Sequence, residues 1–355
     1  MVSSSCRNTD PADERAELAP AALERWLRAR GLPRYRTPQI LQWVYQRRAT
    51  SPAEMTDVPQ ALRAALTRDF VIPRREPVTV ARAADGTRKL LFHLASGAPF
   101  ESVLIPDPPR LTLCVSSQAG CGMGCRFCAT AQLGLRRNLT VVDIVGQVLA
   151  AQRVLDDGAR ITNVVFMGMG EPLANYRAVV EALAVLTAEW GCGFSARRIT
   201  VSTVGLVPQL ERLVRETSVN IAVSLTATTD ELRNWLMPIN RTYPLGQLLA
   251  ACRTLPLPQR RRITFEYVLL AGLNDTDADA VRLARLLHGI RAKVNVIPFN
   301  HFPAAEFRSP PPDVVRRFQE RLLAANVAAT VRWSRGPDIY AACGQLAAIP
   351  RPALS

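Results

Sequence analysis

The stretch "LTLCVSSQAGCGMGCRFC", residues 111–128, places three cysteines directly after a short β-rich run. The run "LTLCV" has the pattern of a buried strand, and "SSQAG" is rich in residues that favour a loop. Cys121, Cys125 and Cys128 then follow with the spacing C-x3-C-x2-C, in a chain that has eight cysteines altogether. In a reducing compartment such clustered thiols indicate metal binding or catalysis rather than structural disulfides.

Three thiols, rather than four, narrow the kind of metal site. A structural zinc ion usually takes four ligands in two closely spaced pairs, and here a second pair is missing. An iron–sulfur cluster held by three thiolates instead leaves one iron open to a substrate. The remaining cysteines and the histidines stand apart from one another: Cys6, Cys114, Cys192, Cys252, Cys343, His93, His288 and His301. The spacing therefore favours an open iron–sulfur cluster, with a zinc loop as the alternative.

The region around this loop predicts an α/β fold. From Leu111 onward, β-rich runs alternate with helical stretches in repeats of roughly 30 to 40 residues, a pattern typical of parallel sheets. About six such units are too few for an eight-fold barrel, so we expect a partial (β/α)6 barrel over residues 109–348. The β-rich runs are "LTLCV", "TNVVFM", "RRITVST", "VNIAVSL", "ITFEYVLL", "KVNVIPF" and "ATVRWS".

The sequence before the barrel divides into three parts. Residues 1–17 are polar and without period, and we expect a disordered lead-in. Residues 18–72 have helical periodicity and many arginines, which predicts a small helical module that binds RNA. Residues 73–108 alternate like strands around an Asp-Gly turn signal at 85–86, which predicts a connecting β-hairpin region.

The charge balance bears on the partner. The formal net charge is +14, almost all of it from arginine, and such a field attracts a polyanion such as RNA, DNA or an acidic membrane surface. The N-terminal segment has no apolar core of the signal-peptide kind, and the apolar runs are too short for a membrane span. We therefore expect a soluble, cytoplasmic protein without a membrane partner.

Polar side chains follow several of the predicted strands. Glu171 in "GMGEPLANY", Ser202, Ser224 and Asn300 each stand at the end of a strand. Small polar groups at successive strand ends converge on one mouth of a barrel, where such folds bind ligands. A cysteine loop of this spacing after the first strand of a partial barrel resembles the radical S-adenosylmethionine (SAM) superfamily. This resemblance implies a [4Fe–4S] cluster, one per chain, whose open iron binds SAM and cleaves it to a 5′-deoxyadenosyl radical.

A narrower resemblance is to the RlmN family of RNA adenine methyltransferases, with its relative Cfr. It extends over the whole chain after the lead-in, through "FESVLIP", "LCVSSQAGCGMGCRFCATAQLGLRRNLT", "VVFMGMGEPLANY", "VSTVGL", "DELRNWLMPIN" and "RGPDIYAACGQLA". The resemblance implies that Cys121, Cys125 and Cys128 hold the cluster. It assigns SAM binding to Gly170, Glu171, Ser202, Ser224, Leu225, Thr226 and Asn300, and catalysis to Cys343, Cys114 and Glu101.

The same resemblance implies a mechanism and partners. Cys343 takes a methyl group from one SAM, the radical from a second SAM activates that group, and the resulting methylene joins adenine carbon 2. Cys114 then resolves the protein–RNA adduct, which leaves a transient disulfide with Cys343. Glu101 is the implied proton acceptor. The implied partners are 23S rRNA, tRNA and an electron donor such as flavodoxin or ferredoxin, and the implied state is a monomer.

Three positions depart from the family pattern, and three alternatives stay open. Thr226 stands where His is usual, and Pro337 and Tyr340 replace acidic residues. The first alternative is Cfr-like methylation of carbon 8, the second is a radical SAM enzyme of another reaction, and the third is a basic RNA-binding protein with a structural zinc. No role follows for Cys6, Cys192 or Cys252, of which we expect the last two to lie in the core.

Overall fold

The structure is a computed structural model of the chain, and it describes residues 15–156, 158–303 and 305–347. The chain divides into two compact units. The first unit comprises Met1–Arg74 together with Ala188–Cys192, and the second comprises Arg75–Thr187 together with Gly193–Ser355. None of the described helices is both long and apolar enough to cross a membrane.

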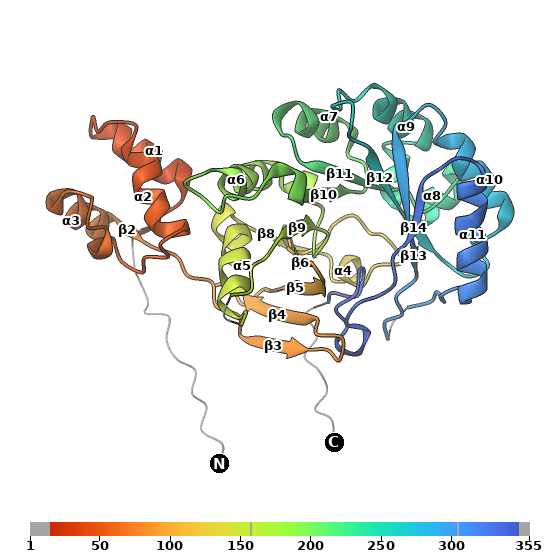
Figure 1. The fold of residues 1–355 in the computed structure, drawn as a ribbon, viewed down its shortest axis with the longest axis horizontal. Coiled ribbons are helices and arrows are strands. Elements are labelled where there is room, and N and C mark those ends of the chain that lie inside the picture. The colour runs from red at the N-terminus through yellow and green to blue at the C-terminus, as the bar shows by residue number, and fades with distance from the viewer. Residues whose placement is uncertain (1–14, 157, 304, 348–355) are drawn as a thin grey trace, which may run out of the picture. The chain divides into compact units, whose positions relative to one another are not determined.

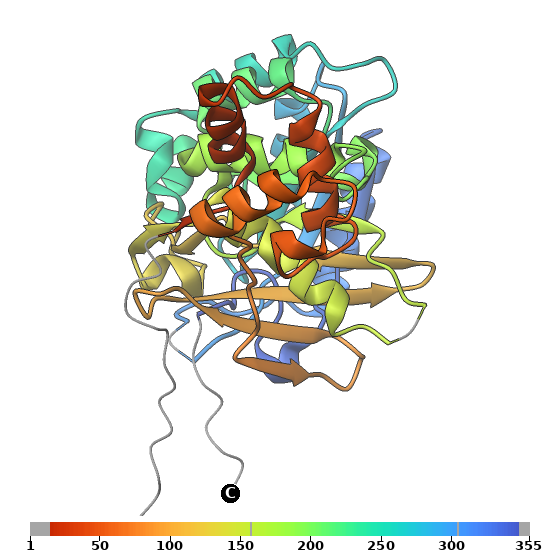
Figure 2. The same cartoon turned by 90° about the vertical axis from the view of Figure 1, so that its left-hand side faces the viewer.

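The first unit is a small helical module (Figure 2), as the periodicity predicts. Its helices are α1 (Pro20–Ala29), α2 (Arg36–Tyr45) and α3 (Gln60–Asp69), with a 3-10 turn at Pro52–Glu54. The apolar faces of these helices form its core, in which Leu23, Ile40, Leu41 and Leu66 are fully buried. The segment 188–192 also belongs here, since Trp190 packs against Tyr45 with ring centroids 6.1 Å apart.

The disordered lead-in expected over residues 1–17 was predicted to extend too far toward the C-terminus. Ala16–Glu17 forms a short strand, β1, which pairs in parallel with β2 (Phe70–Val71). Two residues are too few to show a period in the sequence, and the strand is defined by a partner more than fifty residues away. The rest of the predicted lead-in, residues 1–14 with Cys6, lies outside the described residues.

The second unit contains one ten-stranded sheet (Figure 1), with the strand order β14-β13-β12-β11-β10-β9-β6-β5-β4-β3. From β6 to β14 all neighbouring strands are parallel. These strands are β6 (Arg110–Cys114), β9 (Asn163–Phe166), β10 (Ile199–Thr203), β11 (Asn220–Ser224), β12 (Ile263–Leu269), β13 (Ala292–Pro298) and β14 (Ala329–Val331). The six-unit α/β partial barrel expected from the sequence is thereby confirmed.

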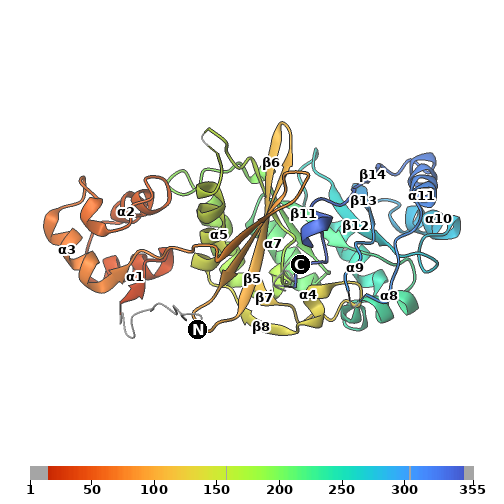
Figure 3. The same cartoon turned by 90° about the horizontal axis from the view of Figure 1, so that it is seen from below.

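Helices cover the outer face of the parallel strands, as Figure 3 shows for α10 and α11 beside β13 and β14. They are α5 (Val141–Arg153), α6 (Tyr176–Thr187), α7 (Val207–Glu216), α8 (Asp230–Leu236), α9 (Leu245–Thr254), α10 (Asp277–Leu286) and α11 (Pro312–Ala324). The alternate strand residues that face these helices are apolar and buried, as Val201, Phe265 and Val294 illustrate. Burial of this apolar layer is what holds the barrel together.

The other face of the same strands is polar. Strand register aligns Thr112 with Asn163, Thr264 with Lys293, and Glu266 with Asn295. Because side chains alternate across a strand, these residues point away from the helices and into the barrel. Barrel interiors are usually filled by bulky branched side chains. Here the barrel interior is a cavity lined by these polar side chains, and the candidate site lies beside it.

The region expected as a β-hairpin linker is instead part of the barrel sheet. Strands β3 (Thr79–Arg82), β4 (Arg88–His93) and β5 (Pro99–Asp107) are antiparallel neighbours, and β5 pairs with β6. The predicted turn is present, with Gly86 at φ 81° and the amide of Thr87 donating to Asp85 Oδ1. Alternation in the sequence identifies strands but not their neighbours, so the continuity with the barrel could not be read from it.

Candidate functional site

A two-stranded ribbon closes the cysteine loop. Strand β7 (Gln118–Gly120) pairs in antiparallel fashion with β8 (Leu135–Asn138), and the amide of Cys121 donates to the carbonyl of Gly134 at 3.0 Å. Gly120 has φ 75°, and a Cβ at this position would lie 1.9 Å from that carbonyl oxygen. Glycine is therefore required where the loop returns on itself. The ribbon holds the three cysteines in a compact loop at the end of β6.

The three loop thiols share one environment. Burial is the main cause that raises the pKa of each thiol above its ordinary value, to about 12 for Cys121. A negative charge on a neighbouring cysteine also raises it: Cys128 acts on Cys121, both of these act on Cys125, and Cys343 acts on Cys128. Thiolates this close to one another need a cation among them. Each thiolate of an iron–sulfur cluster binds a different iron, so their sulfurs need not converge on one point. Indeed, no three His, Cys, Asp or Glu side chains within the described ranges are placed to hold a single metal ion.

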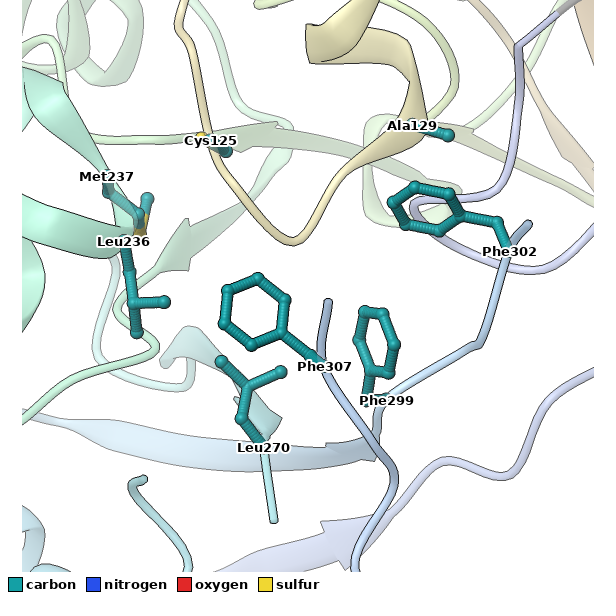
Figure 4. Close-up of a cluster of buried hydrophobic side chains, with 8 residues drawn as sticks. All are labelled: Cys125, Ala129, Leu236, Met237, Leu270, Phe299, Phe302 and Phe307. Carbon is teal, nitrogen blue, oxygen red and sulfur yellow. The ribbon is translucent and has the colours of Figure 1, made fainter. Parts of the chain in front are cut away.

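An apolar cluster lies under the cysteine loop (Figure 4). Phe307 and Phe299 pack edge to face with centroids 6.0 Å apart, and Phe302 lies 6.1 Å from Phe299. Its buried members are Cys125, Ala129, Leu236, Met237, Leu270, Phe299, Phe302 and Phe307. These side chains keep water from one side of the loop, which suits a cluster held by thiolates.

A pocket of about 160 Å³ opens in front of the loop. It is lined by all three loop cysteines and by five of the predicted SAM-binding residues, namely Gly170, Glu171, Ser202, Ser224 and Asn300. Cys343 lines it as well. The structure thus brings together residues from five different strand ends. This donor set fits the [4Fe–4S] cluster: three thiols hold it, and a polar pocket beside it has room for the ligand of the open iron.

Glu171 is the acidic group of this pocket. It follows Gly170, whose φ is 96° and whose Cβ would lie 2.5 Å from Gln118. Its Oε1 accepts from the amide of Leu173 at 3.0 Å and its Oε2 from the amide of Val204 at 2.9 Å. Burial raises the pKa of Glu171 to about 7, although these hydrogen bonds lower it. Such a carboxylate fits the ammonium group of SAM.

Two predicted SAM-binding residues do not line the pocket. The carbonyl of Leu225 accepts from Arg233 Nε at 3.1 Å, and that of Thr226 accepts from Asn274 Nδ2 at 2.7 Å. Thr226 has φ 57°, which is strained for a β-branched residue, and its Oγ1 is buried without a partner among the described residues. Both residues lie behind Ser224 and support the strand end.

A second, smaller pocket holds the two lone cysteines. Cys114 and Cys343 both line this pocket of about 30 Å³, and Cys343 also lines the first pocket. Burial raises the pKa of Cys114 to about 12, and a negative charge on Cys343 would raise it further, whereas Arg332 lowers it. Asn300 lines both pockets, and its Nδ2 donates to the carbonyl of Cys343 at 2.9 Å. The structure therefore places the predicted methyl carrier between its predicted partner and the SAM pocket.

Glu101 is buried and lines none of these pockets. It lies on β5 and forms an ion pair with Lys89, whose Nζ is 3.0 Å from Glu101 Oε1. The same Nζ donates to the carbonyl of Tyr340 at 3.4 Å, three residues before Cys343. Ile105 lies further along β5 on the same face as Glu101, and it lines the second pocket. Glu101 thus faces the side of the sheet on which Cys343 lies.

The segment that carries Cys343 is held from two sides. The amide of Ala129, in the short helix α4 (Ala129–Gln132), donates to the carbonyl of Gly344 at 2.7 Å, and Thr130 Oγ1 donates to the carbonyl of Leu346. At its other end, the amide of Gly336 donates to Asp85 at 3.0 Å and the amide of Ala84 donates to Asp338 at 3.1 Å. The cysteine loop and the β3–β4 turn therefore position Cys343 together.

Two of the three departures from the family pattern, Pro337 and Tyr340, fall in this held segment. Pro337 begins the 3-10 helix Pro337–Ile339, and Tyr340 follows it with φ 51° and a half-exposed ring. Of the cysteines without a predicted role, Cys252 is buried, as expected. Cys192 was also expected in the core but is only partly buried, because it lies in a turn rather than in a strand or helix.

Sequence reasoning missed the residues that support the site. Arg233 is fully buried and donates to the carbonyls of Val204, Ser224 and Leu225 and to Asn240. Gln118 accepts from the amide of Glu171 at 2.9 Å. Arg233 lies within the motif "DELRNWLMPIN", which could have identified it as a functional residue. It was missed because an arginine in a predicted helix is expected to face solvent.

Comparisons with known proteins agree with this geometry. Residues 115–284 match the radical SAM superfamily, and residues 16–72 match the N-terminal domain of ribosomal RNA large subunit methyltransferases. The dual-specificity RNA methyltransferase RlmN of Geobacter sulfurreducens is 55% identical over 324 residues, which cover 91% of this chain and 89% of the relative. The RlmN protein of Anaeromyxobacter sp. is 52% identical over 345 residues, covering 96% and 92%.

A solved structure agrees as well. The crystal structure of a radical SAM methyltransferase from Sphaerobacter thermophilus superposes with a TM-score of 0.86 at 49% identity, covering 94% of this chain and 98% of that one. A [4Fe–4S] cluster and SAM are the cofactors of this enzyme class, and the three-thiol loop with its adjoining pocket fits both. The chain belongs to the RlmN family and is a SAM-dependent radical methyltransferase.

Proposed function

We propose that this enzyme methylates carbon 2 of an adenine in 23S rRNA and, as a second substrate, in tRNA. One observation carries the proposal: Cys114 and Cys343 line one small pocket, and Cys343 also lines the pocket of the cluster thiols. A radical SAM enzyme of another reaction would not need this pair. The names of the relatives, dual-specificity RNA methyltransferases, support RNA as the substrate.

The proposed roles of the residues are those that the family resemblance implies. The Cys343 thiolate displaces the methyl group of one SAM and so becomes S-methylated. A [4Fe–4S] cluster bound by the loop thiols would supply the electron that cleaves a second SAM, and the methyl group on Cys343 would give a hydrogen atom to the resulting 5′-deoxyadenosyl radical. The methylene radical would then add to carbon 2 of the base, and the adduct would return one electron to the cluster and lose the carbon 2 proton, for which Glu101 is the proposed acceptor. Cys114 then attacks the Cys343 sulfur, which frees the methylated base and leaves a disulfide for reduction.

The remaining partners belong to the same proposal. The arginine-rich first unit and the net charge of +14 suit contacts to RNA phosphates. Its match to the N-terminal domain of ribosomal RNA methyltransferases favours carbon 2 over the Cfr-like carbon 8. We infer that the enzyme works as a monomer in the cytoplasm and receives electrons from a flavodoxin or ferredoxin.

The test is expression in a host that lacks its own RlmN, followed by mass spectrometry of 23S rRNA and tRNA nucleosides. We expect 2-methyladenosine in both RNAs. Detection of 8-methyladenosine would select the Cfr-like alternative. An iron-loaded protein that yields neither nucleoside would exclude RNA adenine methylation, and a colourless, iron-free protein with bound zinc would support the RNA-binding alternative.

A cysteine variant tests the mechanism. Cys114→Ala leaves Cys343 free to form the adduct but removes the thiol that resolves it. We expect a covalent protein–RNA species on denaturing gels and no free methylated RNA. Cys252→Ala, which removes a buried thiol of α9 that lines neither pocket, is the matched control and should give no adduct. Free methylated RNA from Cys114→Ala at the wild-type rate would remove Cys114 from the mechanism.

A further inference from the structure

A third and larger cavity occupies the interior of the barrel. Its volume is about 1170 Å³. Six uncharged polar residues of the parallel strands line it, together with the charged Glu266 and Lys293: Thr112, Asn163, Thr200, Thr264, Asn295 and Thr330. A wall of hydroxyl and amide groups is suited to a polar, hydrogen-bonding guest rather than to an apolar one. We call this cavity the inner chamber.

The inner chamber adjoins the reaction site. It shares six lining residues with the pocket of Cys114 and Cys343, namely Ile105, Met167, Arg332, Trp333, Ser334 and Arg335. Arg332 Nη1 lies 3.6 Å from Met167 Sδ, so these two side chains form the boundary between the cavities. The inner chamber therefore lies directly beside the pocket that Cys343 lines.

The rim of the inner chamber is built for a nucleic acid strand. Arg197, Lys293 and Arg335 line it, and the Trp333 side chain is 52% exposed beside them. Three acidic residues of the lining already have partners: Asp107 pairs with Arg110 at 2.6 Å and with Arg335 itself at 3.6 Å, and Asp85 and Asp338 accept from the amides of Gly336 and Ala84. Cations beside an exposed indole are the usual combination for single-stranded RNA, since phosphates bind the cations and a base stacks on the ring.

One acceptor at the inner end of the chamber is unused. Glu266 lines both the inner chamber and the SAM pocket and is 5% exposed. Its Oε1 accepts from Asn295 Nδ2 at 3.0 Å, whereas its Oε2 is buried and has no partner among the described residues. A buried polar atom without a partner calls for an explanation, and a ligand donor is the one the cavity suggests. A carboxylate accepts hydrogen bonds only, so the group that it fits is an N–H donor.

We propose that the target adenine enters through the inner chamber, with a flanking base stacked on Trp333, and that Glu266 Oε2 accepts a hydrogen bond from the adenine amino group. This inference rests on the proposed function and adds the route and the means of base selection. Guanine and inosine carry an oxygen acceptor where adenine carries its amino group, so the free carboxylate oxygen would reject them.

The variant Glu266→Gln tests the reading of the base. Its amide oxygen keeps the bond from Asn295, so its NH2 group takes the place of Oε2 and offers a donor instead of an acceptor. Two 23S rRNA fragments serve as probes, one with the target adenosine and one with inosine in its place. We expect the wild type to bind the adenosine fragment about tenfold more tightly than the inosine fragment, and the variant to lose or reverse this preference.

Controls separate this inference from its alternatives. Asp107→Asn makes the same chemical change at the rim and should leave the preference intact. SAM also contains an adenine and Glu266 lines the SAM pocket, so SAM binding is measured without RNA as a separate readout, and Glu266→Gln should change it less than it changes the preference for adenosine. An unchanged preference, or a tenfold loss of SAM binding in its place, would overturn the assignment. The probes report binding, so this outcome is distinct from a wild-type enzyme that methylates no RNA.

The route has its own test. Trp333→Ala should weaken binding of the adenosine fragment about tenfold, and Trp333→Phe should restore most of it, because stacking needs only an aromatic face. Leu323→Ala, which removes an equally exposed apolar side chain from α11, should have no effect. Equal affinities of Trp333→Ala and Leu323→Ala would show that the RNA does not pass this rim.

Discussion

At the scale of single residues, environment rather than residue type sets the chemistry. Glu171 and Glu266 are both buried glutamates of the SAM pocket. Both oxygens of Glu171 accept backbone hydrogen bonds, whereas one oxygen of Glu266 has no donor in the part of the chain that the structure describes. Spacing in the sequence was sufficient to predict that Cys121, Cys125 and Cys128 share one site, and all three line one pocket, because they belong to one short loop. Burial decides the roles of Arg233 and Glu266, and burial depends on strands that are distant in the sequence.

The raised pKa of Glu171 predicts a pH dependence of SAM binding. Burial raises this pKa to about 7, and only the ionised carboxylate attracts the ammonium group of SAM. Affinity should therefore increase about tenfold per pH unit as the pH rises toward 7, and level off above it. Equilibrium binding of SAM to the cluster-loaded enzyme between pH 5.5 and 8.5 measures this. Glu171→Gln should bind more weakly and without the pH slope; a slope that persists in this variant would assign it to another group.

At the scale of elements, the alternation of strands and helices was enough to predict the barrel, and each of the six predicted units is present. The sequence did not predict how the ends are held. The β3–β4 turn and the segment before Cys343 are about 250 residues apart. Only the fold shows that Asp85 accepts from the amide of Gly336 and that Asp338 accepts from the amide of Ala84. Such a contact has no local signature, because Asp in a turn is ordinary.

Removal of this contact should impair the placement of Cys343. The pKa of Asp85 is lowered although burial raises it, because the amides of Gly336 and Thr87 favour the carboxylate. Its contribution is therefore present at neutral pH and lost only as the pH falls through a value below its ordinary 3.8. Solvent reaches this side chain, so Asp85→Ala should lower the free energy of unfolding by only about 1 kcal/mol.

The same variant should slow S-methylation of Cys343 by SAM, about fivefold if the full contact energy positions the thiol. Mass spectrometry of the intact protein measures this methylation, and urea unfolding measures the stability. Asp156→Ala is the control, since it removes an exposed ion pair with Arg88 on the neighbouring strand. If Asp156→Ala slows S-methylation equally, the contact of Asp85 with Gly336 is not specifically required to position Cys343.

At the scale of the whole molecule, the positive net charge predicted a polyanionic partner most directly. The sequence could not show how the cationic residues are distributed between the two units. Arg25, Arg34 and Arg48 are exposed in the first unit, whereas Arg197, Lys293 and Arg335 surround the inner chamber of the second. Both groups suit a polyanion. Their contributions are separable because each neutralised phosphate adds to the salt dependence of binding.

Replacement of Arg25, Arg34 and Arg48 by Ala should therefore weaken RNA binding and flatten its salt dependence. The slope of log affinity against log salt should fall in magnitude by about 2 to 3 if all three contact phosphates. Binding of a 23S rRNA fragment from 50 to 300 mM salt measures this slope. Arg285→Ala with Arg316→Ala, on the outer helices α10 and α11, is the control. A slope equal to that of the control would place RNA binding in the second unit alone.

The hydrogen bond from Ala129 to Gly344 has a consequence for the placement of Cys343. The helix that carries this donor begins directly after Cys128, so the proposed methyl acceptor Cys343 is positioned by the residues that follow the third predicted cluster ligand. A change that displaces the cysteine loop would therefore displace Cys343 as well.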